Sequence, residues 1–178
     1  MRYIALLRGI NVSGQKKIKM ADLRTLMESL GLNHVKTYIQ SGNVIFDTPR
    51  QEDWAGRMEA AIANEFGFAV PVITRKVNEL AEIIKNSPFT PPPGDESKYL
   101  IALLSSKANP NNMDLFTPYL KEEESLWILE HEIYLHCPEG SGKSKLTNTL
   151  IEKKMGCSAT MRNWKTIVKL NQLSQENP

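Results

Sequence analysis

The chain has 178 residues, of which 41% are hydrophobic and 24% charged, and its formal net charge is +2. This composition is typical of a globular protein and excludes a disordered or fibrous chain. The length suits one large domain or two small ones, and it allows a substantial buried core.

The charged residues are unevenly distributed along the chain. Residues 1–36 carry seven Lys/Arg and two acidic residues, and residues 137–178 carry seven and three. The middle of the chain, residues 37–136, carries eight Lys/Arg against fifteen acidic residues. Because both ends of the sequence are basic, we expect any anion-binding site to draw on them.

The number of cysteines and the length of the apolar runs indicate in which cellular compartment the protein is expected. The two cysteines, Cys137 and Cys157, form neither a disulfide framework nor a C-x-x-C pair. The apolar run near the N-terminus is too short for a signal peptide, and no run is long enough to span a bilayer. We therefore expect reduced thiols, a cytoplasmic location and no membrane partner.

The first half of the chain alternates between two hydrophobic periodicities. Their order predicts strand, helix, strand, strand, helix and strand, which is the split-βαβ or ferredoxin-like arrangement. The expected ranges are residues 3–7, 20–30, 35–39, 44–46, 53–66 and 70–73. A further helix is expected over residues 78–85.

A proline-rich segment then interrupts regular structure, because residues 87–95 contain four prolines and a glycine. We predict an N-terminal ferredoxin-like subdomain over residues 1–87, a linker over 88–97 and a C-terminal α+β subdomain over 98–178 that ends in a closing helix. Strands are expected at residues 99–104, 126–129, 133–136 and 159–161, and helices at 113–120, 143–155 and 164–173. The expected fold class is α+β, with two ferredoxin-like (split βαβ) subdomains in tandem.

Two strand ends in the first half carry similar polar motifs. Arg8, Gly9 and Asn11 follow the first strand, and Gln40, Gly42 and Asn43 lie between the second and third strands. Glycine permits a positive φ or a close backbone approach, whereas Arg, Gln and Asn offer several hydrogen-bonding groups. In the split-βαβ order the first and third strands are antiparallel neighbours. We therefore expect the two motifs to form one recognition site at an edge of the first subdomain.

The basic loop at residues 14–19 lies beside Arg8 and Asn11 in the sequence. With them it could contact phosphate oxygens. A solvated loop that keeps the surface soluble explains its lysines equally well. A structural ion pair, for example with Asp22, is an alternative role for Arg8.

Residues 137–144 include the Gly-Lys-Ser end of a phosphate-binding loop, between an expected strand and an expected helix. The full pattern requires glycine where Cys137 stands, and Pro138 removes a backbone donor. Nucleoside-triphosphate hydrolysis is therefore not expected. A looser anion site at Lys143 and a flexible turn that caps the helix both remain open.

Near the C-terminus, Arg162 precedes a helix for which Asn163 is the expected N-cap. An arginine at this place suits an anion or carboxylate contact, and a structural cap suits the segment equally well. Trp164 is expected in the core.

Other known chemistries lack their sequence patterns. The expected third strand has a glycine and one aromatic residue, but not the stacking pair of an RNA-recognition motif. His131 and His136 are an odd number of residues apart, which places them on opposite faces of a strand. We expect neither a metal nor a cofactor, and no catalytic residue can be assigned.

Together these segments resemble an uncharacterised bacterial family, the domain of unknown function 1697. The resemblance spans nearly the whole chain, and it implies an α+β fold of two ferredoxin-like subdomains but no particular activity. It rests on the motifs at residues 6–12, 38–44, 144–146 and 160–166.

Three functional hypotheses follow from the sequence. The preferred one is a non-catalytic module that binds nucleic acid or a phosphorylated small molecule. The alternatives are a transferase or hydrolase acting on a phosphorylated metabolite, and a structural or protein-interaction domain. A binding module predicts an open basic sheet face, an enzyme predicts a concave pocket, and a structural role predicts buried, fully bonded polar residues. The candidate ligand-binding residues are Arg8, Asn11, Gln40, Asn43, Arg162 and Lys143.

Overall fold

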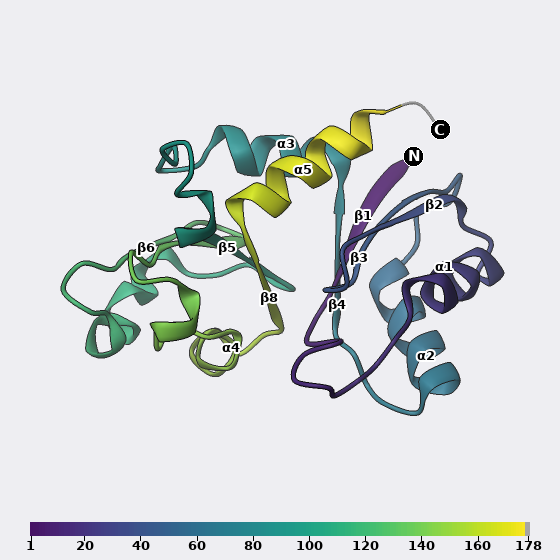
Figure 1. Ribbon diagram of the computed structural model, residues 1–178, viewed down its shortest axis with the longest axis horizontal. Coiled ribbons are helices and arrows are strands. Elements are labelled where there is room, and N and C mark those ends of the chain that lie inside the picture. The colour runs from purple at the N-terminus through teal and green to yellow at the C-terminus, as the bar shows by residue number, and fades with distance from the viewer. Residues whose placement is uncertain (177–178) are drawn as a thin grey trace. The chain divides into compact units, whose positions relative to one another are not determined.

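The computed structural model describes residues 1–176 and contains two units, each built on its own four-stranded antiparallel sheet (Figure 1). Unit 1 comprises Met1–Ala81 and Leu170–Pro178, and unit 2 comprises Glu82–Lys169. Each unit has a separate cluster of buried hydrophobic side chains.

The sheet of unit 1 has the strand order β2-β3-β1-β4, and every neighbouring pair is antiparallel. Along the chain the elements follow the order predicted from the sequence. They are β1 (Arg2–Leu7), α1 (Met20–Ser29), β2 (Asn33–Tyr38), β3 (Asn43–Asp47), α2 (Trp54–Phe66) and β4 (Val72–Lys76).

The sheet of unit 2 has the equivalent order β6-β7-β5-β8, again antiparallel throughout. The prediction of an α+β protein is thereby confirmed, and the topology is consistent with two tandem ferredoxin-like subdomains. Two further helices, α3 (Val77–Lys85) and α5 (Trp164–Gln175), cross the boundaries between the units. The other elements of unit 2 are β5 (Tyr99–Leu104), β6 (Ser125–Ile128), β7 (Glu132–His136), α4 (Asn148–Met155) and β8 (Ala159–Asn163).

Two helix predictions in unit 2 were wrong. The helix expected over residues 113–120 is replaced by short 3-10 turns at Pro110–Leu115 and Thr117–Tyr119. Pro118 explains this, because it has no N–H for an α-helical bond and its ring clashes with the preceding turn. The helix expected from residue 143 begins only at Asn148, where the Thr147 hydroxyl accepts a bond from the Leu150 N–H at 3.2 Å.

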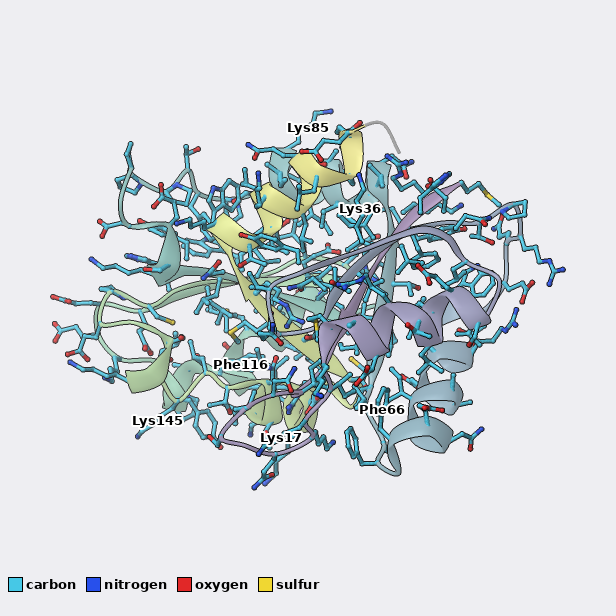
Figure 2. The ribbon with its side chains drawn as sticks, turned by 45° about the vertical axis from the view of Figure 1, so that its right-hand side comes forward. Lys17, Lys36, Phe66, Lys85, Phe116 and Lys145 are labelled. Atoms are coloured by element: carbon cyan, nitrogen blue, oxygen red, sulfur yellow. The ribbon has the colours of Figure 1, made fainter. Side chains whose placement is uncertain are left out.

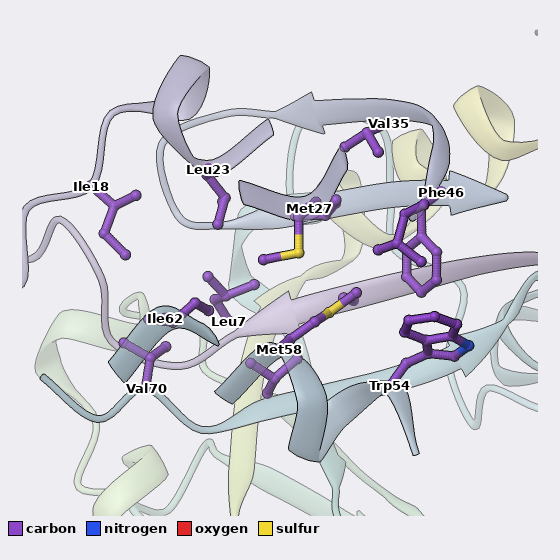
Figure 3. Close-up of a cluster of buried hydrophobic side chains, with 14 of the residues drawn as sticks. Leu7, Ile18, Leu23, Met27, Val35, Phe46, Trp54, Met58, Ile62 and Val70 are labelled. Carbon is purple, nitrogen blue, oxygen red and sulfur yellow. The ribbon is translucent and has the colours of Figure 1, made fainter. Parts of the chain in front are cut away.

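The core of unit 1 lies between helices α1 and α2 and one face of the sheet (Figure 3). Phe46 stacks on Tyr3 with ring centroids 5.6 Å apart, and Trp54 meets the Phe46 ring edge-on at 6.1 Å. Asp53 starts α2 by accepting a bond from the Gly56 N–H, as an N-cap residue does. Other core side chains drawn in the figure include Leu7, Ile18, Leu23, Met27, Met58, Ile62 and Val70.

One polar cluster joins the first strand of unit 1 to the end of the last helix. The Arg2 guanidinium donates to both carboxylate oxygens of Asp47, at 2.8 and 2.9 Å, and to the Ser174 carbonyl at 2.9 Å. His34 Nδ1 lies 2.9 Å from the same carboxylate. The hydrogen bond from Arg2, and to a lesser extent the one from His34, lowers the pKa of Asp47. Such bidentate, charge-assisted pairs are among the stronger polar interactions in proteins.

This cluster predicts how stability depends on pH. Because the pKa of Asp47 is lower in the folded state, its contribution is present above the unfolded-state pKa and is lost as pH falls through the folded value. Asp47→Asn should therefore lower the free energy of unfolding at about pH 7, and the difference from the wild type should shrink below about pH 4. Urea unfolding at both pH values measures this.

The matched control is Glu28→Gln, which changes an exposed acidic residue on α1. Its effect should be small at both pH values. A pH-independent gap between Asp47→Asn and the wild type would contradict the role given to the Asp47 carboxylate.

Candidate functional site

The two polar motifs predicted to meet do lie together in unit 1. In the β1–β3 pair Leu6 is opposite Asn43, and the Leu7 N–H donates to the Gly42 carbonyl at 2.8 Å. The Asn11 Nδ2 donates to the Gln40 carbonyl at 2.9 Å. These bonds join the end of β1 and the first loop, residues 8–19, to the second loop, residues 39–42. We refer to the pair as the two-loop site.

Gly42 is required by the close approach of the second loop to the end of β1. Its φ is +79°, and a Cβ added there would lie 2.7 Å from both Leu7 Cβ and Ile10 Cδ1. Both of those neighbours are buried, at 0% and 1% exposure. No larger side chain fits at this position unless the core residues move.

Asn11 braces the first loop and connects it to the second. Its Nδ2 donates to the Ile18 and Gln40 carbonyls, and its Oδ1 accepts from the Ile18 N–H, each at 2.9 Å. Its own φ of 55° is left-handed, a conformation that asparagine tolerates better than most residues. Both amide hydrogens are thus donated within the protein.

Asn43 has a corresponding place in the second loop. Its side chain is fully buried, and Nδ2 donates to the Tyr38 carbonyl at 2.9 Å and to Ser41 Oγ at 3.0 Å. These bonds hold the chain as it turns from β2 into β3. Burial places Asn43 behind the loop surface.

Several residues of the two loops have left-handed backbone conformations. Ile39 has a φ of 49° although it is β-branched, and its side chain is 48% exposed. A β-branched residue in this region is an outlier, and strained residues of this kind are concentrated at functional sites. In the first loop the left-handed residues are Gly9, Asn11, Ser13, Gly14 and Lys16.

The exposed surface of the two-loop site combines basic, amide and apolar side chains. Gln40, Lys17 and Lys19 are exposed, and Lys17 is labelled on the first loop in Figure 2. Arg8 is half-buried where β1 ends, and its backbone N–H donates to the Pro71 carbonyl at 2.9 Å. Val12 is 58% exposed. The cationic groups can attract an anion, while the loop backbone fixes their positions.

The non-helical face of the unit 1 sheet is not an open basic surface. By strand alternation this face carries charged residues such as Lys36 and Arg75, and its apolar residues are Ile4, Leu6, Ile45 and Ile73. Their exposures are 0%, 0%, 3% and 2%. The apolar part of this face is therefore not open to an anion.

Two of the predicted ligand residues belong to unit 2. Lys143 is exposed in the 3-10 turn Ser141–Lys143, which precedes α4 and does not form its first turn. Arg162 is 9% exposed on β8 and donates to Thr160 Oγ1 and the Met161 carbonyl, both at 2.9 Å. Burial lowers the pKa of Arg162 to about 10. The Asn163 Oδ1 accepts from the Thr166 N–H at 2.9 Å, as an N-cap does.

The described residues give little support to cysteine or metal chemistry. Burial raises the pKa of the Cys137 thiol, which disfavours the reactive thiolate. Among residues 1–176 no group of three His, Cys, Asp or Glu is arranged to hold a metal. Within the same residues no helix is long and apolar enough to cross a membrane.

A cavity of about 320 Å³ in unit 1 lies outside the two-loop site. It is lined by Ser29, Leu30, Gly31, Asn33, Thr48, Pro49, Arg50 and Trp54.

Comparison with known proteins assigns the chain to a family. The family described as protein of unknown function DUF1697 matches residues 1–134, which include both loops. The chain belongs to this family. The family resemblance seen in the sequence motifs is thereby confirmed.

A solved structure also shares the DUF1697 chain's fold. It is the conserved bacterial protein SP0830 from Streptococcus pneumoniae, with a TM-score of 0.75 and 24% sequence identity, over 98% of each chain. At this identity the likeness establishes the fold alone. No curated protein matches the chain.

The close approach at Gly42 gives a first test of the site's construction. Gly42→Ala should destabilise the protein through left-handed strain, about 1–2 kcal/mol, and through overpacking against Leu7 and Ile10, about 1–3 kcal/mol more. Gly31→Ala is the matched control, because Gly31 also has a positive φ but no atom lies within 4 Å of its added Cβ. Equal losses of stability for the two variants in urea unfolding would contradict the steric role of Gly42.

A second test separates the bonds made by Asn11. Asn11→Asp keeps an acceptor for the Ile18 N–H but loses both donated bonds, whereas Asn11→Ala loses all three. Each lost bond should cost about 0.5–1.5 kcal/mol. Hydrogen exchange at the Ile18 amide should accelerate strongly in Asn11→Ala and less in Asn11→Asp. If the exchange rate of the Ile18 amide is unchanged in both variants, the hydrogen bonds of the Asn11 side chain do not hold the first loop in place.

Proposed function

We propose that the protein is a cytoplasmic, non-catalytic module that binds an anionic ligand at the two-loop site. The ligand class is nucleic acid or a phosphorylated small molecule. The observation that carries this proposal is the bond from Asn11 to the Gln40 carbonyl, because it joins a basic loop to an amide-bearing loop. The second loop alone carries no basic residue, and the first loop alone lacks Gln40.

In this proposal the polar residues of the two motifs divide into two roles. Asn11 and Asn43, whose amide hydrogens are donated within the protein, hold the loops in shape. Arg8 and Gln40 contact the ligand at the loop surface. Arginine suits phosphate oxygens because its guanidinium can donate two parallel bonds, and the glutamine amide adds a neutral donor.

The lysines of the first loop supply attraction of longer range. Lys17 and Lys19 are exposed, whereas Lys16 Nζ donates to the Ala69 carbonyl at 2.6 Å. Two exposed cations beside Arg8 favour a ligand with more than one negative charge. In unit 2 we propose Lys143 as a further anion contact and Arg162 as a buried cation that fixes β8.

One observation favours the structural or protein-interaction alternative. Asn43 is buried and both of its amide hydrogens are bonded, as that alternative predicts for the motif residues. Gln40 is exposed, which that alternative does not predict. The transferase or hydrolase alternative predicts a concave pocket that gathers Arg8, Gln40 and Arg162. The cavity described in unit 1 is lined by other residues.

Binding measurements at two salt concentrations test the proposal. Fluorescence anisotropy with labelled single-stranded RNA, single-stranded DNA and a nucleotide should show binding that weakens between about 50 and about 200 mM salt. The double variant Lys17→Gln/Lys19→Gln should bind more weakly. For single strands the slope of log K against log salt should fall by about 0.7 for each phosphate that the variant no longer neutralises.

The control variant is Arg50→Gln, which removes an exposed cation from unit 1 outside the two loops. It should bind as the wild type does. The proposal fails if no probe binds in a salt-sensitive way, or if the control weakens binding as much as the loop variant.

A further inference from the structure

The sheet of unit 2 carries aromatic rings on the face opposite its main core cluster, a face on which Ile101 and Leu103 are also fully buried. Tyr99 on β5 lies directly across from His136 on β7, and their rings stack at 4.3 Å with an interplanar angle of 17°. Trp127 on β6 lies across from Tyr134 on β7. Because side chains alternate along a strand, all four rings share one face. The neighbouring residues Leu100, Leu126, Ile133 and Leu135 point to the core on the other face.

A fifth ring, Phe89, sits among these aromatic side chains. Its centroid is 4.8 Å from that of Tyr99, 5.8 Å from those of Trp127 and Tyr134, and 5.6 Å from that of Trp164. Three of these ring pairs are edge-on. We call Tyr99, Trp127, Tyr134 and Trp164 the aromatic cage. One planar ring already fills it.

Phe89 belongs to a proline-rich strap, residues 88–95, that is weakly attached to the sheet. Within the described chain, the hydrogen bonds of these residues reach only residues 87–98. The far end of the strap is closed by an ion pair between Asp95 and Lys98, 2.6 Å apart. Lifting the strap would thus break no strand pairing, and the Phe89 ring is its main anchor.

We propose that Phe89 occupies the place of a nucleobase, and that the cage binds bases of single-stranded nucleic acid when the strap lifts. Aromatic residues on the central strands of a four-stranded antiparallel sheet are the means by which such sheets stack two or three bases. Trp127, already 36% exposed, offers the first contact. This site lies in unit 2 and goes beyond the two-loop site proposed above.

Two lysines beside the cage could neutralise phosphates, although Glu132 lies on the same face of β7 as Tyr134 and His136. Lys98 precedes Tyr99 in the chain, and its partner Asp95 would leave with the strap. Lys165 follows Trp164 and is exposed. Stacked bases would therefore have cations available for their phosphates, as in other single-strand binding surfaces.

Removing the ring that fills the cage tests the proposal directly. Labelled ten-nucleotide oligo-U and oligo-dT should bind Phe89→Ala more tightly than the wild type, by about fivefold or more, because the cost of lifting the strap is removed. The double variant Phe89→Ala/Trp127→Ala should lose that gain, because one stacking surface is gone. Equal affinities of the wild type and Phe89→Ala, or a gain that survives Trp127→Ala, would overturn the proposal.

A measurement on the wild-type chain covers the case in which Phe89→Ala does not fold. Saturating oligo-U should accelerate limited proteolysis within residues 88–94, since the strap must leave the cage. Unchanged or slower cleavage overturns the proposal, and faster cleavage with an aromatic peptide but not with oligo-U assigns the cage to a protein ligand instead.

The outcome can be separated from that of the two-loop site. In the Lys17→Gln/Lys19→Gln background, the ratio of affinities between Phe89→Ala and its parent should persist if the cage binds independently. Salt-sensitive binding that depends on the loop lysines but not on Phe89 would retain the proposed function and reject this inference.

Discussion

The close approach of Gly42 to Leu7 and Ile10 is the constraint on which the candidate site depends. A Cβ at position 42 would lie 2.7 Å from each of two buried side chains. The second loop can therefore pack against the end of β1 only if residue 42 is glycine. With the loop in that place, the Asn11 side chain reaches the Gln40 carbonyl at 2.9 Å. Backbone sterics thus bring together two segments that are about thirty residues apart in the sequence, and the polar contacts follow.

This arrangement explains why polar residues of one motif have different environments. Asn43 is buried and Asn11 donates both amide hydrogens within the protein, whereas Gln40 is exposed. Motif residues that look alike in sequence therefore have two different roles. Some hold the loops in shape through internal hydrogen bonds, and others lie on the surface. Left-handed backbone at Ile39, which costs free energy in a β-branched residue, lies on the exposed side of the same loop.

The sequence predicted the fold well where the hydrophobic periodicity is regular. The strand Tyr99–Leu104 and the helix Trp54–Phe66 are examples. The prediction failed at residues 113–120, because Pro118 prevents the α-helix that the apolar spacing there indicates. The meeting of the two motifs could also be predicted, because split-βαβ topology makes β1 and β3 neighbours. The position of Phe89 among four aromatic rings could not be predicted, because those rings come from four elements far apart in sequence.

The central claim is that the two loops are energetically coupled. A double-mutant cycle between Asn11→Ala and Gly42→Ala tests it most directly. Displacing the second loop by Gly42→Ala should already weaken the bond from Asn11, so the two losses of unfolding free energy should not add. We predict a coupling energy of at least about 0.5 kcal/mol in urea unfolding. Additivity within about 0.3 kcal/mol would contradict the claim, because it would mean that the loops are held independently.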